Sequence, residues 1–388
     1  MSEIFATGIM GILWIVNLFN GTGLDQVYHV TDIFKYIIIG LSIIVFFFHI
    51  GNKEKRSVES SKIAIFGGTL IVFITTAALN GFLDTTIDYV WVFLLIFLIA
   101  ELKISSKAFA GIGFIFGVLG ALVLVIYNYG SLFIGWNENS IAMLGMHSYL
   151  MFLIPFYKKN KNTWNFKNTV LILTTASIFA YLLKATNCRS GTLFLIIAVF
   201  FYLNLVSKNI LIGNKKRIFI ALFIPLFIAV AVAVISTTPW AETLNTWSLE
   251  KFQKPIFNGR DTLWIDGFKI LKDNFFFGTG DVMMNNWHNS AITCLTAYGS
   301  VGFVLWIKSF HTILGQAKPL FNDYLVVGSA ISFLIIYIQQ SVELGFISSA
   351  PSFIPYIMLG LMLGRVNYLK SNSSRSGHYE TKCNYSHL

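Results

Sequence analysis

Two side chains of the sequence, Arg260 and His288, are of types suited to anion binding and proton transfer. Arg260 follows Asn258-Gly259 at an expected helix start, where free backbone N–H groups already favour an anion. The guanidinium adds a planar fork of donors that matches phosphate. His288 stands beside Asn289 at the edge of the next apolar run, and a neutral imidazole is suited to general-base work near pH 7. The segment therefore predicts a site that binds an anion and removes a proton.

The elements that must position these residues are apolar helices. With 55% hydrophobic residues, 12% charged residues and a mean hydropathy of +0.69, the chain does not have the composition of a soluble globular protein. Runs of about 20 apolar residues are long enough to cross a bilayer as helices. Twelve runs of this kind predict about twelve transmembrane helices, near residues 4–19, 33–50, 63–82, 89–102, 109–127, 141–157, 170–183, 192–205, 218–235, 291–310, 324–339 and 353–369.

The net charge of +10 is explained by membrane topology. With the N-terminus in the cytoplasm, most of the 28 Lys and Arg residues fall on the cytoplasmic side, which is the asymmetry of the positive-inside rule. Nucleic-acid binding is excluded because no basic stripe lies on a soluble face. The exceptions to the rule are Lys35, Lys184, Arg189, Lys251, Lys254, Arg260, Lys269 and Lys272.

Seven of these exceptions lie in two external breaks, the turn at 184–191 and the long loop at 237–287. Ionisable groups near membrane depth are costly and commonly functional, so the converging cations predict an anionic ligand. Arg189 has an alternative interpretation as an anchor at the membrane interface. Gly278-Thr-Gly280 in the loop indicates a turn.

The long loop contains an amphipathic pattern over 261–273, with apolar residues near helical spacing and charged residues between them. It predicts a helix at the membrane surface, which either carries the chemistry or merely covers the bundle. The predicted organisation is nine helices in 1–236, an external catalytic loop at 237–287, three helices in 288–369 and a polar cytoplasmic tail at 370–388. Glycine pairs at 113/117 and 360/364 predict close helix packing.

The motifs together resemble those of a known family. Gly259-Arg260-Asp-Thr-Leu-Trp264, Gly278-Thr-Gly280, His288-Asn289-Ser290 and Tyr298-Gly299-Ser-Val-Gly302 follow one another as in the O-antigen ligase and O-antigen polymerase superfamily of bacterial membrane proteins. Asn187-Cys188-Arg189-Ser190-Gly191 resembles the family's Ser-Arg-Gly turn, with cysteine in place of serine. Asn137-Glu-Asn139-Ser140 resembles its Asn-Pro-Asn helix start, with glutamate in place of proline.

The resemblance implies an all-α, GT-C-like membrane helix bundle that transfers a glycan from undecaprenyl diphosphate. Carried onto this sequence, Arg189 and Arg260 hold the diphosphate and His288 activates the acceptor hydroxyl. Fixed arginines would stabilise the departing charge, so no protein general acid is needed. Further substrate contacts are expected from Lys184, Lys269, Asn289, Trp264 and Gly280.

We expect no cofactor and no metal. Other lipid-linked GT-C enzymes bind a metal through an acidic pair in the first external loop, whereas loop 21–32 offers Asp25 and Asp32 without an Asp-x-Asp spacing. The three cysteines form no metal-binding or disulfide pattern.

The expected location is the bacterial inner membrane, with both termini cytoplasmic. Expected partners are the lipid-linked glycan donor, a glycan or lipid A–core acceptor, membrane lipids and other polysaccharide assembly proteins. The predicted reaction is polymerisation of O-antigen, capsule or exopolysaccharide repeat units. The alternatives are ligation of the glycan to lipid A–core and, in another class, a flippase or transporter of lipid-linked oligosaccharide; the latter does not account for the long loop with Arg260 and His288.

Overall fold

The computed structural model describes residues 3–20, 29–51, 60–130, 137–157, 166–343, 345–348 and 350–375, and all regular secondary structure in these ranges is helical. The α-helices are α1 (Glu3–Phe19), α3 (Val30–Gly51), α4 (Ser60–Leu79), α5 (Leu83–Ala100), α6 (Ser106–Tyr129), α7 (Glu138–Leu153), α8 (Phe166–Lys184), α9 (Arg189–Tyr202), α10 (Asn209–Ile212), α11 (Lys215–Ile235), α12 (Trp240–Phe252), α13 (Arg260–Asp273), α14 (Ser290–Ala317), α15 (Tyr324–Gln339) and α16 (Ile354–Arg375). Two 3₁₀ turns, η2 (Ile154–Phe156) and η3 (Lys318–Leu320), extend α7 and α14.

Each of the twelve apolar runs overlaps one helix of this set. Six helices in the described ranges are long and apolar enough to cross a membrane: α5, α6, α8, α11, and α7 and α14 with their 3₁₀ extensions. Shorter apolar helices lie at Glu3–Phe19, Ala64–Leu79, Arg189–Tyr202 and Tyr324–Gln339. These lengths and compositions are those of a multi-pass membrane protein. A total of twelve spans and a GT-C-like arrangement stay predictions.

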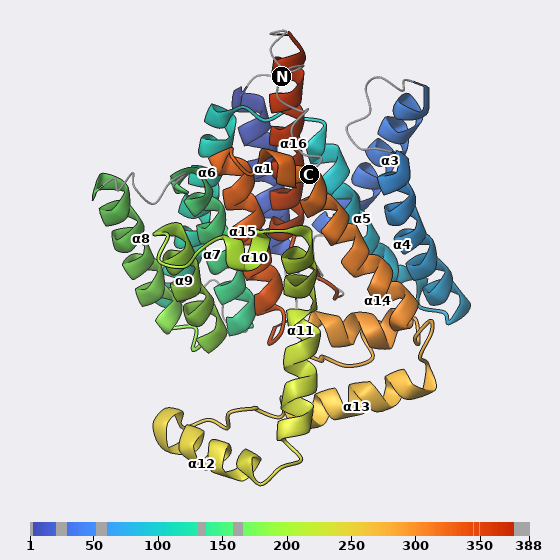
Figure 1. The fold of residues 1–388 in the computed structure, drawn as a ribbon, viewed down its shortest axis with the longest axis vertical. Coiled ribbons are helices and arrows are strands. Elements are labelled where there is room, and N and C mark those ends of the chain that lie inside the picture. The colour runs from blue at the N-terminus through green and yellow to red at the C-terminus, as the bar shows by residue number, and fades with distance from the viewer. Residues whose placement is uncertain are drawn as a thin grey trace, which may run out of the picture.

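The predicted helix in the long loop is confirmed as α13, which starts at Arg260, and its position at the membrane surface stays a prediction. Two short helices, α10 and α12, were not predicted; α12 is a second helix in the long loop. Figure 1 shows α12 and α13 projecting beyond one end of the bundle, with the start of α1 and the end of α16 toward the opposite end. The predicted start of the sixth helix is also confirmed, because the Asn137 side chain caps α7 by accepting a hydrogen bond from the Asn139 backbone N–H.

The predicted glycine packing is confirmed at two helix pairs. A Cβ at Gly117 of α6 would come within 2.9 Å of the Phe152 side chain, where α7 lies against α6. A Cβ at Gly360 of α16 would come within 2.7 Å of Ile99 of α5. Glycine therefore allows these backbones to approach closely. Buried aromatic and aliphatic side chains fill the space between the helices.

A break in α14 joins the long loop to the bundle. Gly299 has φ 66° and ψ −173°, a backbone conformation open in practice only to glycine. The break frees backbone groups to bond with the loop at 275–280. The N–H groups of Thr279 and Gly280 donate to the Thr296 and Ala297 carbonyls, and the Ser300 N–H donates to the Phe275 carbonyl.

Replacing Gly299 by alanine is expected to destabilise the protein by about 2–5 kcal/mol, because it adds backbone strain and a steric clash. The new Cβ would lie 2.3 Å from the Phe276 backbone. Gly315→Ala in the same helix is the matched control, since a Cβ at Gly315 meets nothing within 4 Å. The difference in stability is measured by thermal denaturation of the two purified variants, with size-exclusion chromatography as the readout. Equal stability of the two variants would contradict the role of this break.

Candidate functional site

The start of α13 is fixed against the bundle by a small apolar cluster. Trp264 and Trp287 are both 1% exposed and pack with Ala229 of α11 and Ile292 of α14. The Trp264 indole N–H donates to the Trp287 carbonyl at 2.6 Å. This contact ties the helix that begins at Arg260 to the residue that precedes His288.

Arg260 lies at the first position of α13, after a sharp turn in which Asn258 and Gly259 have φ values of 51° and 78°. Its side chain is 18% exposed, and Nη2 lies 3.7 Å from Oε1 of Glu343. Within the described residues its Nε–H has no hydrogen-bond partner. Burial lowers the pKa of Arg260; Glu343 opposes this effect and the nearby Arg189 charge adds to it.

His288 lies at the other end of the loop, directly before α14. The next residue, Asn289, is fully buried and caps α14, and its amide donates to the carbonyls of Pro225 and Ser341 at 3.0 Å each. These bonds fix the backbone that carries the imidazole. His288 Nδ1 lies 3.9 Å from Oε2 of Glu343. Burial, followed by the Arg260 charge, lowers the pKa of His288 below its usual 6.5, so the imidazole is neutral at pH 7.

Glu343 is the site residue that sequence reasoning missed. Its side chain is 4% exposed and lies between Arg260 on one oxygen and His288 on the other. The Ser190 hydroxyl donates to Oε1 at 2.9 Å. Burial raises the pKa of Glu343, while Arg260 and the Ser190 hydrogen bond oppose this rise. The available signal in the sequence is an acidic residue shortly after the eleventh apolar run, but the positive-inside rule concerns Lys and Arg and does not single out an acidic residue.

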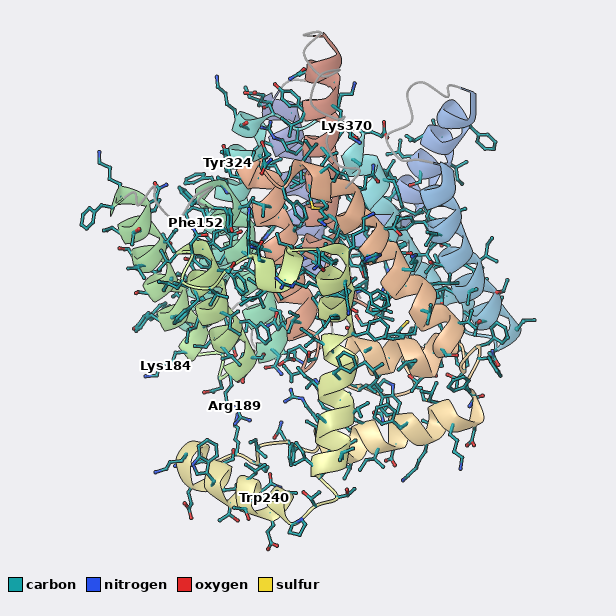
Figure 2. The ribbon with its side chains drawn as sticks, viewed as in Figure 1. Phe152, Lys184, Arg189, Trp240, Tyr324 and Lys370 are labelled. Atoms are coloured by element: carbon teal, nitrogen blue, oxygen red, sulfur yellow. The ribbon has the colours of Figure 1, made fainter. Side chains whose placement is uncertain are left out.

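Arg189 and Lys184 lie at the two ends of the tight turn between α8 and α9. Figure 2 shows both side chains at the end of the bundle that faces the long loop. Arg189 is exposed and is the first residue of α9, adjacent to Ser190. Its charge contributes to lowering the pKa of Arg260, so the two arginines act on the same region. Arg260, His288 and Ser190 thus lie around Glu343, and Arg189 directly precedes Ser190 in the chain.

The other candidate residues have different surroundings. Trp264 and Asn289 are buried and occupied by the structural hydrogen bonds described above. Gly280 packs against α4, where a Cβ would lie 2.9 Å from the Thr76 carbonyl. Lys269 is exposed on α13 and pairs with Asp266 at 2.8 Å. Lys184 is exposed at the end of α8. Direct substrate contact by these five residues stays a prediction, and packing already accounts for the first three.

Within the described residues, no three His, Cys, Asp or Glu side chains gather as they would around a metal ion. Asp32 bonds to Lys35 at 2.9 Å, whereas Asp25 lies outside the described residues. Metal-independent chemistry stays a prediction.

A cavity of about 220 Å³ opens on the His288 and Glu343 side chains. Its wall comes from the end of α1, the start of α7, the loop before α14 and the segment that follows α15. The arrangement can bind an anion at the arginines and accept a proton at the imidazole, with a polar chamber beside it.

Comparison with known proteins agrees with the motifs. Residues 174–307 match the family model of the O-antigen ligases, and this segment contains Arg189, Arg260 and His288. Searches of curated proteins and of solved structures gave no match. The family match supports placing this chain in the O-antigen ligase and polymerase superfamily.

Proposed function

We propose that this protein transfers a glycan from undecaprenyl diphosphate to a saccharide hydroxyl at the outer face of the bacterial inner membrane, in a bundle of twelve GT-C-like transmembrane helices. The family match indicates a ligase or polymerase type of membrane enzyme. Of these two reactions, we propose polymerisation, in which the acceptor is the next lipid-linked repeat.

The observation that carries the proposal is the incomplete pairing of Arg260. Its guanidinium is largely buried, its Nε–H has no partner among the described residues, and its one carboxylate neighbour is 3.7 Å away. Arg189 adds a second positive charge, so Glu343 does not neutralise the site. Buried donors without partners are costly, and a diphosphate would satisfy them. Neutralised diphosphate is also a good leaving group.

His288 is suited to the remaining step, which is removal of the acceptor proton. With Nδ1 protonated and directed toward Glu343, Nε2 is free to accept a proton from the acceptor hydroxyl. That oxygen then bonds to the anomeric carbon of the donor while the bond from this carbon to the diphosphate oxygen breaks. Undecaprenyl diphosphate leaves with the bonding electrons, and His288 carries the proton. The 3.9 Å separation is longer than a hydrogen bond, as is common before a substrate closes the site.

The function is tested in cells by deleting the gene and separating the surface polysaccharide on a gel. For a polymerase, the deletion strain keeps only single repeats on the lipid A–core; loss of all repeats from the core would point to a ligase instead. His288→Ala and Arg260→Lys are both expected to fail to restore the ladder. For His288→Ala the transfer rate is expected to fall by about 100-fold or more. Lysine fails because it lacks the bidentate fork.

The control is Asp273→Asn, which changes an exposed side chain at the end of α13 that has no assigned role in the site. It is expected to restore the ladder. A normal ladder from a His288→Ala protein present in the membrane would refute the base assignment.

The transfer rate should fall at acidic pH with an apparent pKa below 6.5, since the base must be neutral and its pKa is lowered by burial and Arg260. The transfer rate is therefore at its maximum at pH 7 and falls as the pH drops through the lowered pKa of His288. Transfer by the purified protein in lipid nanodiscs, measured from pH 5 to 8 on lipid-linked oligosaccharide extracted from the deletion strain, gives the profile. Half-maximal activity at pH 7 or above would contradict this assignment.

A further inference from the structure

The cavity beside His288 has a chemical character different from that of the arginine site. Five amide side chains contribute to its wall: Asn17, Asn20, Asn137, Asn139 and Asn286. Three serine residues, Ser140, Ser348 and Ser352, contribute as well. Among the described residues that line it, none is Lys or Arg, and the titratable ones are Glu343 and His288.

This lining selects against an anion and for a neutral polyhydroxylated ligand. The wall offers a phosphate or carboxylate no cationic side chain as a direct partner, because Arg260 lies on the other oxygen of Glu343 and does not line the cavity. An amide both donates and accepts hydrogen bonds, and a sugar hydroxyl does the same. An amide-rich wall therefore matches the hydroxyl groups of an uncharged sugar.

The wall is built before a ligand arrives. The Asn17 side-chain oxygen accepts from the Phe353 N–H, and the Asn20 amide donates to the Pro351 carbonyl, both at 2.7 Å. His147 Nδ1 lies 3.3 Å from the Ser352 hydroxyl. These bonds join α1 and α7 to the segment after Glu343. A wall fixed in this way reduces the ordering cost of binding.

Two amides in the wall are available to a ligand. Among the described residues, the side chains of Asn139 and Asn286 have no hydrogen-bond partner, and both line the cavity. Asn139 stands at the start of α7 and Asn286 two residues before His288. His288 lines the same cavity, so a sugar bound there would share its wall with the imidazole.

We propose that this cavity is the subsite for a neutral sugar at the non-reducing end of the acceptor, and that it presents the acceptor hydroxyl to His288. The proposal rests on the glycosyl transfer proposed above. Glu343 separates the two parts of the site, with Arg260 facing one of its oxygens and the imidazole facing the other. The diphosphate occupies the arginine side and the acceptor sugar occupies the amide side.

The test uses oligosaccharide released by mild acid from the lipid carriers of the deletion strain and tagged with 2-aminobenzamide at its reducing end. Binding to the purified full-length protein in nanodiscs is followed by fluorescence anisotropy. Asn139→Ala and Asn286→Ala are each expected to weaken binding about three- to tenfold, the value of one hydrogen bond. Asn285→Ala is the matched control, because Asn285 is exposed in the same loop but does not line the cavity. It is expected to bind like wild type.

Three results would overturn the proposal. The first is unchanged binding in both cavity variants, and the second is equal weakening of binding in Asn285→Ala. The third is that the untagged oligosaccharide binds whereas the tagged one does not. The last result assigns the cavity to the donor's sugar, because a tag at the reducing end blocks only the position next to the diphosphate. Undecaprenyl diphosphate is titrated separately against wild type, Arg260→Lys and Asn286→Ala. Failure of Arg260→Lys to weaken that binding would contradict the proposed function while leaving the sugar result intact.

Discussion

The site depends on one buried carboxylate. Glu343 lies in the segment after α15 and contacts Ser190 of α9, Arg260 of α13 and the imidazole of His288. Burying a carboxylate is costly unless charges and hydrogen bonds compensate, so the arrangement of these three neighbours is constrained by Glu343. The balance is visible in its pKa, which burial raises and Arg260 and Ser190 lower. Segments far apart in the chain are thereby held at one point.

The rest of the loop supports that point from several directions. The hydrogen bond from Trp264 to Trp287 joins the helix of Arg260 to the loop segment that carries His288. Asn289 fixes the start of α14, and the break at Gly299 allows residues 275–280 to bond to the same helix. Arg260 and His288 are thus held by packing and backbone hydrogen bonds, and the geometry does not rely on their weak contacts with Glu343 alone. Such support is what a catalytic arrangement needs, since small displacements of reacting groups are costly.

The sequence predicted the helices well because each apolar run is a local signal that needs no tertiary information. It also singled out Arg260 and Arg189, which are exceptions to the charge asymmetry of the predicted topology, and His288, which stands at the edge of an apolar run at the end of the long loop. Glu343 was not found because its importance comes from neighbours that folding brings together from three other segments. The helix α12 was missed because its mixed polar and aromatic sequence has little amphipathic pattern. Gly280 illustrates the reverse case, in which a motif residue expected to contact substrate has a close packing neighbour that explains glycine.

The most direct test of this account is Glu343→Gln, assayed for transfer rate and for binding of undecaprenyl diphosphate by the purified protein. Glutamine keeps the size of the side chain but removes the charge that faces His288 and partly offsets Arg260. The account predicts a transfer rate reduced by about tenfold or more, with undecaprenyl diphosphate bound as tightly as by wild type or more tightly. An unchanged transfer rate, or weaker binding of undecaprenyl diphosphate, would contradict the central role of this carboxylate.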